Sequence, residues 1–232
     1  MNEDLKIEIR KLLALHEATV RLEHGVREVQ PPGSAWRVFI PSRFIYAFFT
    51  FNSIYAFDWQ SSFDRRKAIR WQPDKENGKY PGQDDQLKAY LKYINNQLSP
   101  DTQTFFGDEL KRMIDLFSIN EPVDALRHVK LVNANKKIKN LSKQLSKHLY
   151  SVLESNQKSD DFYKSAYHLL KFVYKVRCNL FHGKKTRVQL LNSKQQERFK
   201  IYTALLIAAN SLLFKLAEKA NIGWKKVSVE LN

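Results

Sequence analysis

Apolar residues recur every three or four positions along most of this 232-residue chain, and this spacing constrains the fold more than any other feature. Residues at that spacing share one face of an α-helix, which can then be buried. Glycine contributes only 7 residues, and no Gly-x-Gly-x-x-Gly or Gly-Lys-Ser/Thr run occurs. Rossmann and P-loop folds need such glycines at their phosphate sites, so both are disfavoured. The sequence therefore predicts an all-α fold.

The same periodicity, read between Pro, Gly and Asn punctuation, divides the chain into expected helices. Two segments are expected to be extended: an arm at 36–40 and a tail at 222–231. The loop at 71–84 is a point where two subdomains could meet, but composition does not change there, so we expect one domain over 1–232. The expected helices are 3–27, 42–70 (after Pro41), 85–98, 101–119, 122–154 (with a break near 133–135), 160–181 and 193–220.

Positive charge is concentrated in the second half of the chain. Lys and Arg number 39 against 24 Asp and Glu, a formal net charge of +15. Residues 126–153 and 162–196 contain no acidic residue at all. Neutralising phosphates with such a surface releases counterions, so a nucleic acid is the expected partner. A basic face that serves only solubility is the alternative.

Several classes of site and location are disfavoured by the residue inventory. Cys178 is the single cysteine, so no internal disulfide or cysteine-based zinc site is expected. His16 and His24 are too far apart for a His-Glu-x-x-His site, and we expect no metal and no cofactor. The most apolar run, 44–57, is shorter than the roughly 20 residues of a membrane-spanning helix. A cytoplasmic protein without membrane contact is the expectation.

One short segment near the end of the helix expected at 160–181 combines residues suited to phosphate chemistry. Arg177, Asn179 and His182 fall within six positions, and Gly183 follows as a suitable helix C-terminus. Arg177 and His182 are splayed apart on a regular helix, but a helix that ends at His182 lets the ring turn back. Asn179 and His182 share a face. An ordinary helix C-terminus, with His near the dipole and Gly as the cap, is the alternative interpretation.

The segment 177–183 resembles the Arg-x(4–6)-His motif of the HEPN superfamily (higher eukaryotes and prokaryotes nucleotide-binding domains). The aromatic helix containing Phe49, Phe51, Asn52 and Trp59 adds to the resemblance. The resemblance implies an all-α bundle of the HEPN type, here with extra helices and a short extended arm or tail. Many members are metal-independent endoribonucleases of toxin–antitoxin, phage-defence and CRISPR-associated systems, and they usually dimerise so that two motifs face each other.

Two positions depart from the family pattern. Many members have a polar residue directly after the arginine, where this chain has Cys178, and Asn179 comes one position later. Members paired with a nucleotidyltransferase antitoxin often have Tyr two residues after the histidine. This chain has Lys184 there, so control through modification of such a tyrosine is not expected.

The motif residues match the needs of RNA cleavage by the neighbouring 2′-hydroxyl. An imidazole can take or give a proton near neutral pH, and a guanidinium can stabilise negative charge on the phosphate. We therefore expect His182 to act as base or acid, Arg177 to stabilise charge, and Asn179 to orient the histidine or the substrate. A 2′,3′-cyclic phosphate product is what the resemblance implies. Residues expected to bind the flanking RNA backbone are Lys175, Lys184, Lys185 and Arg187.

Two other functions remain open from the sequence. The chain could be a non-catalytic helical module that uses the same motif to bind RNA. It could also be a protein-interaction subunit whose basic face docks an acidic antitoxin or another defence-system partner. Binding without turnover would indicate the first, and a stable protein partner without RNA affinity would indicate the second.

Overall fold

A computed structural model of the chain describes residues 3–28, 36–56, 83–98, 101–127, 129, 136–154, 159–181 and 187–222. Within these residues the chain forms nine helices and no strand, so the prediction of an all-α fold is confirmed. The helices are α1 (Glu3–Glu28), α2 (Trp36–Ala56), α4 (Gln83–Leu98), α5 (Thr102–Leu116), α6 (Pro122–Ala125), α7 (Lys136–Leu153), α8 (Ser159–Phe181), α9 (Arg187–Leu191) and α10 (Ser193–Lys219).

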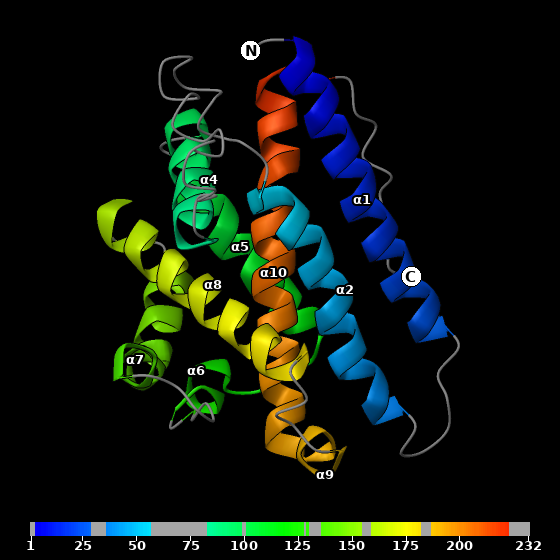
Figure 1. The fold of residues 1–232 in the computed structure, drawn as a ribbon, viewed down its shortest axis with the longest axis vertical. Helices are drawn as coiled ribbons and strands as arrows, with labels where there is room; N and C mark the ends of the chain where they lie inside the picture. Colours follow the sequence, from blue (N-terminus) through cyan, green and yellow to red (C-terminus); the bar gives the residue numbers. More distant parts are fainter. Residues whose placement is uncertain are drawn as a thin grey trace, which may run out of the picture.

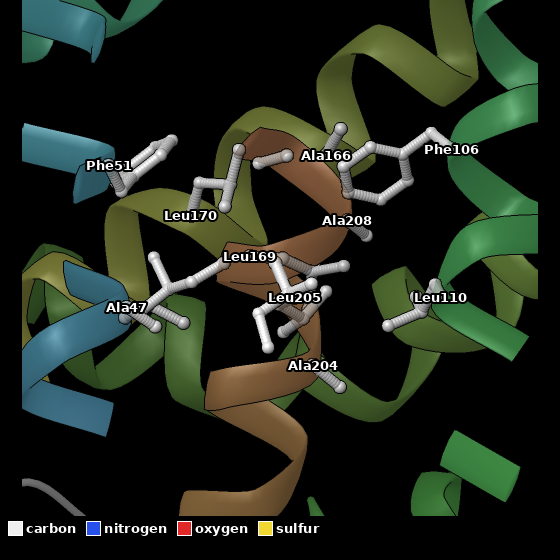
Figure 2. Packing of buried hydrophobic residues seen from close by; sticks show 14 of the residues in the cluster. Ala47, Phe51, Phe106, Leu110, Ala166, Leu169, Leu170, Ala204, Leu205 and Ala208 are labelled. Atoms are coloured by element: carbon white, nitrogen blue, oxygen red, sulfur yellow. The ribbon is translucent and has the colours of Figure 1, made fainter. Parts of the chain in front are cut away.

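Helix α10 is the centre of the bundle. It packs against α2 on one side and α5 on the other, and α1 covers the outer side of α2 (Figure 1). Its residues from Ile201 to Leu213 are all buried, which fits a helix that is apolar on nearly every side. Figure 2 shows Leu205 of α10 lying between Ala47 of α2 and Leu110 of α5.

The start of α2 differs from the prediction. Residues 36–40 were expected to be extended because Pro41 follows them, yet α2 begins at Trp36 and contains Pro41. Proline lacks the N–H for one helical hydrogen bond and crowds the preceding turn. Ile40 and Phe44 are both buried in the core, and their burial offsets this local cost. Helix α2 is described to Ala56, and the rest of the helix expected to residue 70 lies outside the described residues.

The helix expected over 122–154 is divided. The four-residue α6 ends at Ala125, and a new helix, α7, begins at Lys136. The short helix α9 was not predicted, because five residues are too few to show a helical period. Of the expected tail at 222–231, only Ile222 is described, and its side chain is buried.

Helices α7 and α8 form an antiparallel hairpin joined by a network of polar side chains in their interface. His168 Nδ1 lies 3.0 Å from His148 Nε2, and His148 Nδ1 lies 3.2 Å from the Ser165 hydroxyl. Ser165 donates in turn to the hydroxyl of Ser151 at 3.1 Å. Moving forward along α7 from His148 to Ser151 means moving backward along α8 from His168 to Ser165, which fixes the antiparallel register.

This network predicts a loss of stability in mild acid. Burial lowers the pKa of His148 from 6.5 to about 4, and the charges of His168, Lys147 and Lys164 add to the effect. Between those two pH values the unfolded chain binds more protons at this residue than the folded chain does, so the free energy of unfolding falls as the pH falls from 6.5 toward 4. Burial lowers the pKa of His16 to about 4 as well, against the opposing charge of Glu109.

Urea denaturation at pH 7 and at pH 5 measures this loss. We expect a lower free energy of unfolding at pH 5 in the wild-type protein, and a smaller drop in the variant His148→Gln. Because His16 still titrates in that variant, part of the pH dependence remains. If the free energy of unfolding falls by the same amount in His148→Gln as in the wild type, the protonation of His148 does not cause the loss of stability.

Helices α5 and α7 approach each other closely at a glycine. An ideal Cβ atom built at Gly107 of α5 would lie 3.1 Å from the carbonyl oxygen of Val152 in α7. Few real Cβ atoms come so near to a backbone oxygen, so a larger residue at this point requires one of the two helices to move. The glycine therefore sets the distance between α5 and α7.

Helix α10 is also long and apolar enough to cross a bilayer, judged by length and composition alone. Most of its apolar stretch is buried inside the bundle, as expected for the central helix of a globular protein. Among the described residues it is the single helix with these properties.

Candidate active site

Arg177 lies in the last turns of α8, and its guanidinium packs over an aromatic ring of α2. The Cζ atom of Arg177 is 5.3 Å from the centre of the Phe48 ring. This cation–π contact covers one face of the planar guanidinium, while the N–H donors project from its edge. The side chain is half-buried, so it is neither sealed in the core nor fully solvated. The arrangement holds the charge in place and lowers the dielectric around it.

A hydrogen-bonded pair of polar side chains lies on the same face of α2 as Phe48. The Tyr55 hydroxyl donates a hydrogen bond of 2.8 Å to Oδ1 of Asn52, and Asn52 is one helical turn beyond Phe48. Burial raises the pKa of Tyr55 to about 12; the positive charge of Arg177 opposes this shift and Cys178 adds to it. The Tyr55 hydroxyl therefore stays protonated at neutral pH, and it interacts electrostatically with the positive charge of Arg177.

Two further residues of α8 complete this group. The Tyr174 ring lies 6.1 Å from the Phe48 ring, and Cys178 follows one helical turn later in α8. Burial and the neighbouring Cys178 thiol raise the pKa of Tyr174. We call the six residues the Arg177 cluster: Phe48, Asn52, Tyr55, Tyr174, Arg177 and Cys178.

The structure places the predicted site residues differently from one another. Lys175 is half-buried, with its Nζ atom 5.3 Å from the centre of the Tyr174 ring, so it adjoins the Arg177 cluster. Asn179 is half-buried as well, but α8 stays helical to Phe181. Residues two positions apart on a helix differ by about 200° in direction. Asn179 therefore does not join Arg177 at the face toward Phe48.

The remaining predicted residues are only partly covered by the structure. Helix α8 ends at Phe181, directly before His182, in agreement with the helix expected at 160–181. His182, Lys184 and Lys185 lie outside the described residues. Arg187 is the first residue of α9, and its side chain is also outside the description. The pairing of His182 with Arg177 stays a prediction.

Sequence reasoning did not assign Asn52 and Tyr55 to the site. Both belong to a helix that is otherwise dominated by apolar residues, and Phe48, Asn52 and Tyr55 follow one another at helical spacing. That spacing was the available signal that one face of the helix is polar. It could not show that this face meets Arg177, which is more than a hundred positions away in the chain.

The cluster is suited to binding a phosphate group. The guanidinium edge can donate two parallel hydrogen bonds to phosphate oxygens, and the Asn52 amide retains its own N–H donors. Among the described residues no group of three or more His, Cys, Asp or Glu side chains is arranged to hold a metal ion.

Comparisons with known proteins provide no relative for this chain. No protein-family model matches it, and no similar protein was found among curated proteins or among solved structures.

Proposed function

We propose that the protein is a metal-independent endoribonuclease that acts as a homodimer in the cytoplasm. The observation that supports this most directly is the half-buried Arg177 guanidinium near the end of α8, the helix that His182 follows. It is held over Phe48, one helical turn before the hydrogen-bonded pair Asn52 and Tyr55. A fixed cation with its donors at the edge of an apolar wall is the electrostatic element that phosphoryl chemistry requires. The acid-free segments around it favour a polyanionic substrate.

In the proposed reaction, the RNA supplies its own nucleophile. One imidazole removes the proton from a ribose 2′-hydroxyl, and the oxygen attacks the adjacent phosphorus. Arg177 stabilises the negative charge that develops on the phosphate oxygens. The bond to the 5′-oxygen breaks, and that oxygen takes a proton from a second, protonated imidazole. The products are a 2′,3′-cyclic phosphate and a 5′-hydroxyl.

This scheme needs one base and one acid, and each chain contributes one His182. Two copies related by a two-fold axis supply both, which is the reason to propose a composite site in a homodimer. Asn179, three positions before His182, is proposed to orient the imidazole rather than the phosphate. A toxin–antitoxin or phage-defence role follows from the resemblance to HEPN proteins, with an antitoxin as a further partner.

Incubation of the purified protein with RNA of mixed sequence, followed by mapping of the new ends, tests the proposal. We expect cleavage in the presence of EDTA, and 2′,3′-cyclic phosphate at the new ends. The variant His182→Ala removes a proton-transfer group and should lower the rate by about 10²- to 10⁴-fold. The variant His24→Ala, which removes a histidine of α1, serves as the matched control.

Two outcomes would count against this function. Strict dependence on a divalent metal would exclude the proposed mechanism. Salt-sensitive RNA binding with no cleavage by the wild-type dimer would assign the protein to the non-catalytic RNA-binding modules instead.

A further inference from the structure

Helix α7 has one face in the core and one face in solvent, and the two differ in chemistry. The buried face is mainly apolar, with Ile138, Leu141, Leu145, Leu149 and Val152 beside the interface residues Ser142, His148 and Ser151. The solvent face carries lysines, and the helix contains no acidic residue. The fold has already used the apolar face of α7, so lysines, the amides of Asn140 and Gln144, and one aromatic ring remain available to a partner.

The exposed lysines of α7 form a row inclined slightly to the helix axis. Lys139, Lys143 and Lys147 are each exposed and follow one another at intervals of four residues. Four residues rise by about 6 Å along a helix, which is comparable to the distance between successive phosphates of an extended nucleic acid strand. Tyr150, 54% exposed, lies one turn beyond Lys147. We call these four residues the α7 track.

The lysines of the α7 track differ from many other lysines of the protein. Lys6, Lys88, Lys200 and Lys215 each form an ion pair with an acid of their own helix. Within the described part of the chain, no such ion pair holds a lysine of the α7 track. Their charge is therefore available to phosphate groups without breaking an existing pair.

The α7 track lies on the helix that pairs with α8, which carries Arg177. The contacts of His148 with His168 and of Ser151 with Ser165 make the two helices antiparallel where they meet. From that contact α8 continues toward α10, where its last turns lie (Figure 1). RNA bound to the α7 track therefore lies on the hairpin whose second helix carries Arg177.

We propose that the α7 track binds the single-stranded RNA that is cleaved at the Arg177 cluster. The lysines contact successive phosphates, and a base stacks on the exposed ring of Tyr150, as in proteins that bind single strands without reading sequence. This inference rests on the proposed function for its destination, the cleavage site. An anionic membrane is the less suitable partner, because a helix that binds a bilayer inserts its apolar face, and that face of α7 is buried.

The salt dependence of binding tests the α7 track. The affinity of the full-length protein for a fluorescent single-stranded RNA is measured between 0.1 and 1 M salt. Replacing Lys139, Lys143 and Lys147 with Gln together should reduce the slope of log K against log[salt] by about 2, since each phosphate contact contributes about 0.7. With equal affinity of the two proteins at 1 M salt, this difference in slope makes the triple variant bind about 100-fold more weakly than the wild type at 0.1 M salt.

Matched controls keep the total charge and the number of aromatic rings comparable. Replacing the exposed Lys92, Lys111 and Lys219 with Gln removes the same charge from α4, α5 and α10, and should leave the slope unchanged. Tyr150→Ala should weaken binding by about 5- to 100-fold. Tyr46→Ala removes an exposed tyrosine of α2 and should have no comparable effect.

The outcomes separate this inference from the proposed function. If the α7 and control triple variants lose the same affinity, or if the α7 lysines control sedimentation with anionic vesicles but not RNA binding, the α7 track is overturned while RNA cleavage can still stand. If the wild-type protein shows the predicted slope but never cleaves, the proposed function fails and the α7 track stands. Arg177→Ala removes one phosphate contact at the cleavage site and should lower the slope by only about 0.7, against about 2 for the α7 triple variant.

Discussion

Replacing Arg177 with alanine should lower the rate of RNA cleavage by about 10²- to 10³-fold, the loss typical when one preorganised charge-stabilising donor is removed. The same change removes the contact with Phe48, which is worth about 0.5–1 kcal/mol at a partly exposed site. The variant should therefore stay folded. Single-turnover cleavage of a labelled RNA measures the rate, and circular dichroism confirms the fold.

Arg177→Lys and Arg127→Ala are the informative comparisons. Lysine keeps the charge but loses the planar fork, so it should restore only part of the rate. Arg127 is exposed and pairs with Asp124 outside the Arg177 cluster, so its loss should leave cleavage intact. Equal rates for Arg177→Ala and the wild type would remove Arg177 from the chemistry.

The largest effect on stability is expected at Leu205 in the middle of α10. This side chain is fully buried where α2, α5 and α10 meet (Figure 2). Truncation to alanine removes the burial of several carbon atoms and leaves a cavity, which together cost about 2–5 kcal/mol. Because domains of this kind are stable by about 5–15 kcal/mol, the loss is a large share of the total.

Urea denaturation of Leu205→Ala measures this loss directly. Leu15→Ala is the control, because Leu15 of α1 is 39% exposed and its truncation should change the free energy of unfolding far less. A similar loss in the two variants would mean that α10 is not the centre of the core.

The sequence predicted the long helices well because the spacing of their apolar residues repeats over many turns. The ends of α1, α8 and α10 fall within a residue or two of the predicted ends. The predicted start of α2 was wrong, because Pro41 is a local signal for a break in a helix. The burial of Ile40, which favours the longer helix, is a property of the folded molecule that the local sequence does not show. Local signals and tertiary packing competed there, and packing determined the outcome.

The candidate site could be predicted only on one helix. Arg177 and its neighbours were visible because they are close together in the chain. Asn52 and Tyr55 come from α2, and nothing in the sequence fixes how α2 and α8 face each other. The pairing of His148 with His168 was missed for the same reason, since it depends on the register of the hairpin.

Gly107 couples the position of α7, which carries the exposed lysines, to the position of α5 in the core. The absence of a side chain there allows the α5 backbone to lie against the carbonyl of Val152 near the end of α7. An alanine at this point would require α5 or α7 to give way by a few tenths of an ångström, which would shift the row of lysines slightly without altering a single charge. The position of the basic surface thus depends on the missing side chain of Gly107 in α5, which packs behind the helix that bears the lysines.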